Sequence, residues 1–95
     1  MGVLLMGKSV SYSNFDYKPV DIIPVIASFD SDGHIAPLYV RIEGESYKID
    51  SFWMSCNFQN IIEFKCKVIC GDFLKPLLLT YYKHENVWTM PKEQT

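Results

Sequence analysis

The first pattern that suggests chemistry lies near the N-terminus, where Gly2 to Ser9 read G-V-L-L-M-G-K-S. This spacing matches G-x-x-x-x-G-K-[ST], the loop with which many nucleotide-binding proteins hold phosphates. The chemistry needs a helix that starts at the lysine, so that backbone amides and the helix dipole converge on the phosphate. Ser9 to Pro19 have no helical period, and no parallel α/β pattern follows. We therefore interpret the match as a coincidence of spacing, and the sequence predicts no cofactor.

The candidate nucleophiles and bases are three cysteines (Cys56, Cys66 and Cys70) and two histidines (His34 and His84). An odd number of cysteines fits no disulfide framework. On an extended strand Cys66 and Cys70 lie roughly 13 Å apart, too far to share a metal ion or a disulfide. Nothing in the sequence brings either histidine to a thiol, so we expect buried structural thiols. The alternative is a small thiol-dependent enzyme or ligand-binding barrel that uses His34 or His84.

Acidic side chains gather in two predicted turns, Asp30 with Asp32 and Glu43 with Glu45. Turns favour Asp for local reasons, because its carboxylate bonds to backbone amides nearby. No cysteine or histidine spacing typical of zinc sites occurs in the chain. We therefore predict no metal site, no catalytic residue and a non-enzymatic protein.

The remaining candidates are aromatic and basic side chains on the outward faces of predicted strands. Aromatic rings stack on bases and cations contact phosphates, while Tyr, Trp and Arg are also frequent in protein interfaces. The competing interpretation places half of the aromatic rings in the core of a small barrel. We predict a binding surface for a protein or single-stranded nucleic acid, made of Tyr39, Arg41, Lys65, Lys67, Tyr82 and Trp88.

Predicted β-strands position these side chains. The segments that carry them show the two-residue alternation of apolar and polar residues that is typical of half-buried strands. In residues 35–42, Leu38 and Val40 belong to one face and Tyr39 and Arg41 to the other. Residues 51–58 break the alternation, which predicts a β-bulge or a short helical turn. The predicted strands cover residues 20–29, 35–42, 47–50, 61–70, 77–82 and 87–90.

Short turns join these segments, and no stretch has a helical period over three turns. The sequence predicts an all-β domain over residues 19–91, a small antiparallel barrel or rolled sheet of five to six strands. Residues 1–18 are expected to be a poorly ordered lead-in or an added edge strand, and residues 92–95 a tail. A further alternative is a structural role, in which an open edge strand pairs two copies into a homodimer.

Composition narrows the class of protein. The chain has 95 residues, which suits a single domain, and 48% of them are hydrophobic, enough for a compact core. The net charge of -2 argues against a dedicated duplex-DNA binder. No apolar run approaches the roughly 18 residues that span a bilayer, and no secretory or myristoylation signal is evident. We expect a cytoplasmic protein without membrane contact.

One part of the chain also resembles a known group. Residues 37–49 (P-L-Y-V-R-I-E-G-E-S-Y-K-I), with 79–82 (L-T-Y-Y) and 87–90 (V-W-T-M), are similar to small bacterial SH3-like barrel proteins of unknown function. The shared outline is a proline and an aromatic residue before a glycine-centred hairpin, then a late aromatic strand and a closing tryptophan. The resemblance implies an SH3-like barrel without catalytic residues. Some members are encoded near translesion DNA polymerases, which implies a role beside DNA repair.

Overall fold

The computed structural model describes residues 19–92. The phosphate-loop pattern at residues 2–9, the predicted lead-in at residues 1–18 and residues 93–95 of the predicted tail lie outside the described residues.

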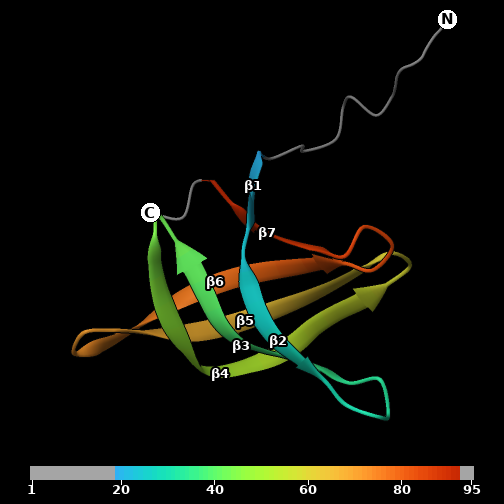
Figure 1. Cartoon of the computed structure of the whole chain (residues 1–95), viewed down its shortest axis with the longest axis horizontal. Coiled ribbons are helices and arrows are strands. Elements are labelled where there is room, and N and C mark those ends of the chain that lie inside the picture. The colour runs from blue at the N-terminus through green and yellow to red at the C-terminus, as the bar shows by residue number, and fades with distance from the viewer. Residues whose placement is uncertain (1–18, 93–95) are drawn as a thin grey trace, which may run out of the picture.

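The described residues form one antiparallel sheet of seven strands joined by short turns (Figure 1). This confirms the prediction of an all-β antiparallel domain. Neighbouring strands follow the order β1-β7-β6-β5-β4-β3-β2. The strands are β1 (Val20–Ile23), β2 (Val25–Phe29), β3 (Ile35–Ile42), β4 (Glu45–Phe58), β5 (Ile61–Cys70), β6 (Phe73–Tyr82) and β7 (Val87–Pro91).

The structure has seven strands rather than five or six because the segment predicted as one strand over 20–29 divides at Pro24. Proline has no backbone N–H to donate to a ladder, so a strand tends to break or bend there. β1 pairs with β7, whereas β2 pairs with β3. The carbonyl of Pro24 accepts the N–H of Arg41 at 3.0 Å. The two outermost strands of the sheet are therefore consecutive in the chain and meet at Pro24.

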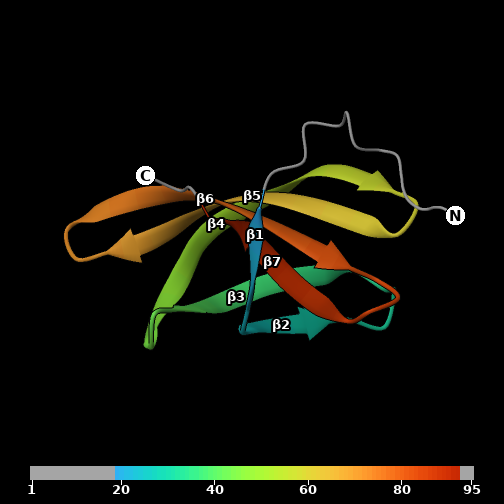
Figure 2. The ribbon, with the colours of Figure 1, turned by 90° about the horizontal axis from the view of Figure 1, so that it is seen from above.

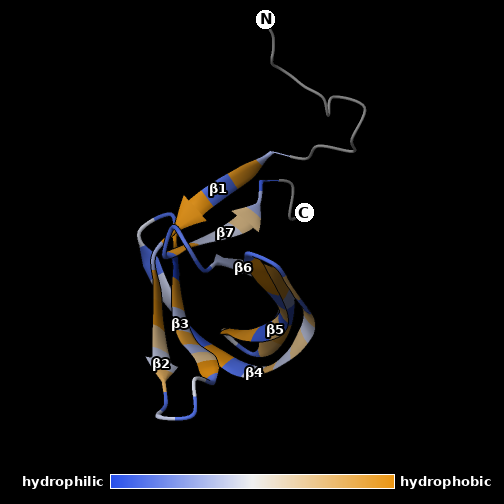
Figure 3. Cartoon of the chain, turned by 90° about the vertical axis from the view of Figure 1, so that its right-hand side faces the viewer, coloured by the Kyte–Doolittle hydropathy of each residue, from blue (hydrophilic) through white to orange (hydrophobic). Residues whose placement is uncertain are grey.

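The sheet curls into a half-barrel around its apolar side. Figure 3 shows β4, β5 and β6 curling around the interior, with β2 and β3 on the opposite side. Figure 2 shows the β4–β5 and β5–β6 turns at opposite ends of the molecule. The Trp88 ring packs in the interior with its centroid 4.9 Å from that of Tyr81 and 5.7 Å from that of Phe64. The buried apolar side chains are Ile23, Val40, Ile49, Ile62, Phe64, Cys66, Val68, Leu77, Leu79, Tyr81, Trp88 and Met90.

β5 follows the predicted alternation. Phe64 and Cys66 are buried, while Lys65 and Lys67 are exposed on the outer face. This confirms the assignment of the two faces, because a strand in regular register sends successive side chains to opposite sides.

β3 contains a bulge that changes the face of one residue. Ile26 pairs with Tyr39 and Ala27 pairs with Pro37, so Leu38 has no partner on β2. An extra residue in one strand interrupts the alternation, so residues on the two sides of the bulge no longer follow one continuous two-residue period. Leu38, predicted on the buried face, is 39% exposed for this reason, and Pro37 is buried instead.

The segment 51–58 is part of β4 and contains the predicted irregularity as a β-bulge. The pairing of β4 with β5 shifts between Ile49 and Ser51 and again between Met54 and Cys56.

No helix long and apolar enough to cross a membrane occurs in residues 19–92.

Candidate binding surface

The outer face of β3, β4 and β5 carries four exposed basic side chains. Each is next to an inward-facing residue on its strand, so the alternation of the strand turns it away from the core. None of the four forms an ion pair with another residue of the described range. These cations are Arg41, Lys48, Lys65 and Lys67.

Two exposed aromatic rings lie beside these cations because of strand pairing. Tyr39 on β3 is opposite Lys48 on β4, and Trp53 on β4 is opposite Lys65 on β5. Residues directly opposite each other have Cβ atoms about 4.5–5.5 Å apart. Tyr39 is 41% exposed and Trp53 is 51% exposed. Each ring therefore stands on the outer face with an unpaired ammonium group as its cross-strand neighbour.

Two shallow depressions follow the same face. One, of about 390 Å³, has Trp53, Lys65 and Lys67 in its wall. The other, of about 140 Å³, is lined in part by Tyr39 and Arg41. Both depressions are open to solvent, so an extended ligand has more access to this face than a compact one.

Acidic groups near this face are few. Asp50 is the residue left without a partner in the first bulge of β4. Glu63 on β5 accepts the hydroxyl of Ser55 at 2.8 Å. Among the residues that the structure describes, four cations against two carboxylates leave this part of the sheet positive, although the whole chain has a net charge of -2.

The structure brings together four of the six residues predicted from sequence. Tyr39, Arg41, Lys65 and Lys67 share the outer face, whereas Tyr82 is half-buried at the end of β6. Trp88 is 6% exposed and packs in the core, so it is not accessible to a surface ligand.

Two residues of the surface were not singled out by the sequence. Lys48 has the outward position that alternation predicts, but only the pairing of β3 with β4 shows that it is opposite Tyr39. Trp53 belongs to the segment that breaks the alternation, so its face depends on the two bulges of β4. We call the resulting set the basic–aromatic face: Tyr39, Arg41, Lys48, Trp53, Lys65 and Lys67.

The thiols have different surroundings. Cys66 is 2% exposed, and burial raises the pKa of its thiol to about 11. The thiolate is the nucleophilic form of cysteine, so such a group is largely unreactive near neutral pH. Cys56 and Cys70 are half-buried. Within residues 19–92, neither His34 nor His84 makes a side-chain hydrogen bond to a cysteine.

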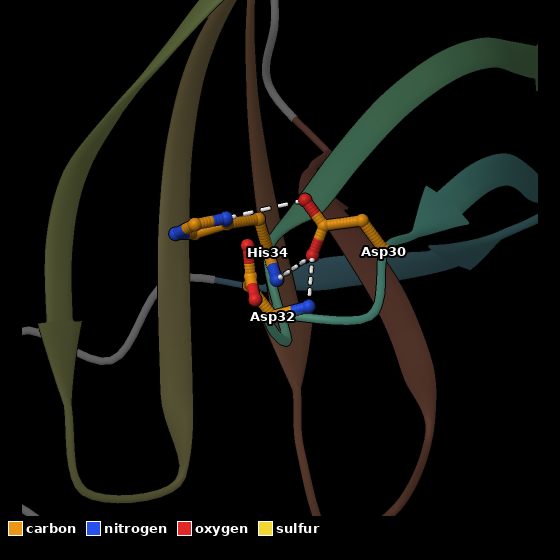
Figure 4. A group of neighbouring side chains, drawn as sticks. All are labelled: Asp30, Asp32 and His34. Atoms are coloured by element: carbon orange, nitrogen blue, oxygen red, sulfur yellow. Dashed lines mark hydrogen bonds and ion pairs between the residues drawn. The ribbon is translucent and has the colours of Figure 1, made fainter.

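The turn between β2 and β3 holds a group of three polar side chains, Asp30, Asp32 and His34 (Figure 4), with candidate ligand atoms within 4.8 Å of one another. Asp30 Oδ1 accepts the backbone N–H of Asp32 at 2.9 Å and that of His34 at 2.8 Å. Its Oδ2 lies 3.2 Å from His34 Nδ1. The hydrogen bond from the backbone of His34 is the main cause that lowers the pKa of Asp30. All three residues are exposed, and the carboxylate of Asp30 holds the turn together.

Comparison with known proteins finds no matching family model, no matching curated protein and no matching solved structure. The function of the chain is therefore inferred from its basic–aromatic face.

Proposed function

We propose that this chain is a small non-enzymatic binding module, built as an SH3-like barrel, that binds single-stranded nucleic acid on its basic–aromatic face. One observation carries the proposal: exposed rings and unpaired cations are cross-strand neighbours, Tyr39 with Lys48 and Trp53 with Lys65. Such a module acts where single strands are exposed, which fits a role beside DNA repair.

Single strands suit this face better than a duplex. Unpaired bases stack on aromatic side chains at any sequence, and each stacked base contributes about 1–3 kcal/mol. Neighbouring cations contact the phosphates that connect those bases. A duplex hides its bases, and reading it needs an element that enters a groove. The basic–aromatic face is the outer surface of a curved sheet and has no projecting helix or ribbon, so it supplies stacking and charge rather than groove contacts.

The test is fluorescence anisotropy with labelled single-stranded DNA and RNA of mixed sequence. Tyr39→Ala and Trp53→Ala are each expected to weaken binding roughly 5- to 150-fold, because each removes one stacking platform. Phe73→Ala is the matched control, since Phe73 is 65% exposed and lies outside the face. Binding that survives Tyr39→Ala, Arg41→Ala and Trp53→Ala contradicts the proposed surface, as does a chain that binds no single strand.

The free edge of β4 favours a second candidate function, the pairing of two copies into a homodimer. β4 pairs with β3 only over Glu45–Lys48, so within the described residues the segment 51–58 has β5 as its one strand neighbour. That segment has neither proline nor charge, the usual protection of an edge strand, and Met54 within it is 51% exposed. The edge of β6, in contrast, carries Lys75 and Pro76.

Light scattering tests the homodimer. A dimer that becomes a monomer with Met54→Lys, but not with Leu74→Lys on the protected edge of β6, supports pairing through β4. A wild-type chain that stays monomeric at high concentration excludes it.

A further inference from the structure

A pocket outside the basic–aromatic face lies where β6 and β7 separate. β6 pairs with β7 only over Thr80–Tyr82, so its first residues diverge from the end of β7. The pocket has a volume of about 520 Å³, within the usual range for occupied protein pockets. We call it the β6–β7 pocket. Its apolar wall includes Ile42, Val68, Leu77 and Met90.

The rim of the β6–β7 pocket carries opposite charges on its two sides. Lys75 and Lys92 lie on the side of β6 and β7. Glu43, in the turn between β3 and β4, and Glu45, the first residue of β4, lie on the other side. Lys92 already pairs with an aspartate of β1, whereas Lys75 forms no ion pair within residues 19–92. On the acidic side, the charge of Glu45 raises the pKa of Tyr47. An occupant with one negative and one positive group matches this rim.

The chain itself enters beside the pocket. The carbonyl of Pro19 accepts the backbone N–H of Lys92 at 3.2 Å, and Lys92 is a rim residue. Eighteen residues precede Pro19 in the sequence. At about 3.3–3.6 Å per residue, Tyr17 reaches up to about 7 Å and Phe15 up to about 14 Å from Pro19. The four residues before Pro19 read F-D-Y-K, which combines two rings with one carboxylate and one ammonium group.

We propose that the segment Phe15–Lys18 docks in the β6–β7 pocket. The two rings cover the apolar wall, and Asp16 lies beside Lys75. Lys18 lies beside the acidic turn between β3 and β4. The occupant of the pocket is then the chain's own N-terminal segment rather than a separate ligand. This docking is independent of the proposed binding of nucleic acid, because none of its residues belongs to the basic–aromatic face.

Cys70 supplies the measurement, because it lines the pocket and is half-buried. In the full chain with Cys56→Ser and Cys66→Ala, the rate of labelling by a thiol reagent reports how well the pocket is covered. Phe15→Ala with Tyr17→Ala is expected to raise this rate about tenfold or more, since the double substitution removes both rings that bury apolar surface in the pocket. Tyr12→Ala, an aromatic truncation outside the docked segment, should leave the rate unchanged. Labelling of Cys56, measured with Cys66→Ala and Cys70→Ser, should be unaffected because Cys56 lies outside the pocket.

A charge exchange tests the register without removing either ring. Asp16→Lys and Lys75→Asp should each raise the labelling rate of Cys70 about two- to fivefold, and the two together should restore protection. The docking is overturned if Cys70 is labelled at equal rates in the chain that keeps both rings and in Phe15→Ala with Tyr17→Ala. It is also overturned if the double charge exchange does not restore the slow labelling of Cys70. Protection that increases with protein concentration also overturns it, because the segment then comes from a second copy.

Discussion

Cys66 illustrates how burial decides the chemistry of a single residue. Its position on the inner row of β5 leaves it 2% exposed, beside the side chains that form the core. Burial disfavours the charged thiolate and raises the pKa from its usual 9.0 to about 11. The thiol therefore acts as a small apolar group, which agrees with the sequence interpretation of Cys66 as a structural thiol.

This raised pKa predicts a pH dependence of stability. Above pH 9 the unfolded chain loses the thiol proton while the folded chain retains it. The free energy of unfolding therefore falls as the pH rises from 9 toward 11. A shift of about two pKa units corresponds to roughly 2–3 kcal/mol. Denaturant unfolding of the wild type and Cys66→Ala checks this. At pH 7 the wild type should be more stable than Cys66→Ala by roughly 1 kcal/mol, because it buries the sulfur atom. This difference in the free energy of unfolding should vanish or reverse by pH 11. A difference that does not change with pH contradicts the assignment.

At the scale of the element, the turn between β3 and β4 shows a local conflict between sequence and backbone. Ile42 pairs with Glu45, so only Glu43 and Gly44 form the loop. Both have positive φ, 50° for Glu43 and 84° for Gly44, as a tight hairpin turn requires. Glycine adopts this conformation freely, whereas glutamate is strained in it. The turn therefore stores strain at Glu43.

Glu43→Asn should relieve part of that strain, because asparagine tolerates the left-handed region and Asn-Gly is the preferred pair for such turns. We expect the free energy of unfolding to rise by roughly 0.5–1 kcal/mol. Thermal and denaturant unfolding measure it, with Glu45→Asn as the control at a neighbouring strand position. An equal gain from both substitutions would show that removal of negative charge, and not backbone strain, is responsible.

At the scale of the whole molecule, the core depends on side chains from strands far apart in the sequence. Leu79 on β6 is 0% exposed and pairs with Phe64 on β5, whose ring approaches Trp88 on β7. Since β1 and β2 meet at Pro24, the two ends of the sheet are also tied together. We expect the domain to unfold in one cooperative transition.

Leu79→Ala tests the core directly. It should lower the free energy of unfolding by about 2–5 kcal/mol, through lost burial and the cavity that remains. Leu74 lies on the same strand but is 46% exposed, so Leu74→Ala should cost less than about 1 kcal/mol. Similar losses from the two variants, measured by denaturant unfolding, are incompatible with the described core.

The distribution of charge over the molecule predicts how binding depends on salt. A chain of net charge -2 should repel nucleic acid, but four of its cations lie on one face and form no ion pair with any residue in the range 19–92. Each phosphate contact with a single strand adds about -0.7 to the slope of log affinity against log salt, so four contacts predict roughly -2.8. Lys65→Gln with Lys67→Gln should reduce the steepness by about half, whereas Lys75→Gln, on the opposite face of the sheet, should not change it. A slope near zero for the wild type would remove phosphate contact from the proposal.

Periodicity along single strands was enough to predict much of this structure. The alternation at residues 61–70 identified the inner and outer faces of β5, and turn residues marked most strand ends. Lys65 and Lys67 were therefore placed on the outer face correctly. These predictions hold because side-chain direction within a regular strand depends only on neighbours in the chain.

Pairing between strands decided the features that periodicity did not predict. The break at Pro24, the bulge at Leu38 and the two bulges of β4 arise from how strands align with their partners. That alignment placed Tyr39 beside Lys48 and Trp53 beside Lys65, and the curl of the sheet buried Trp88. Local composition predicts that a strand exists and which residues alternate along it. Which partner lies opposite each residue depends on contacts distant in sequence, so the candidate site took its form only in the folded sheet.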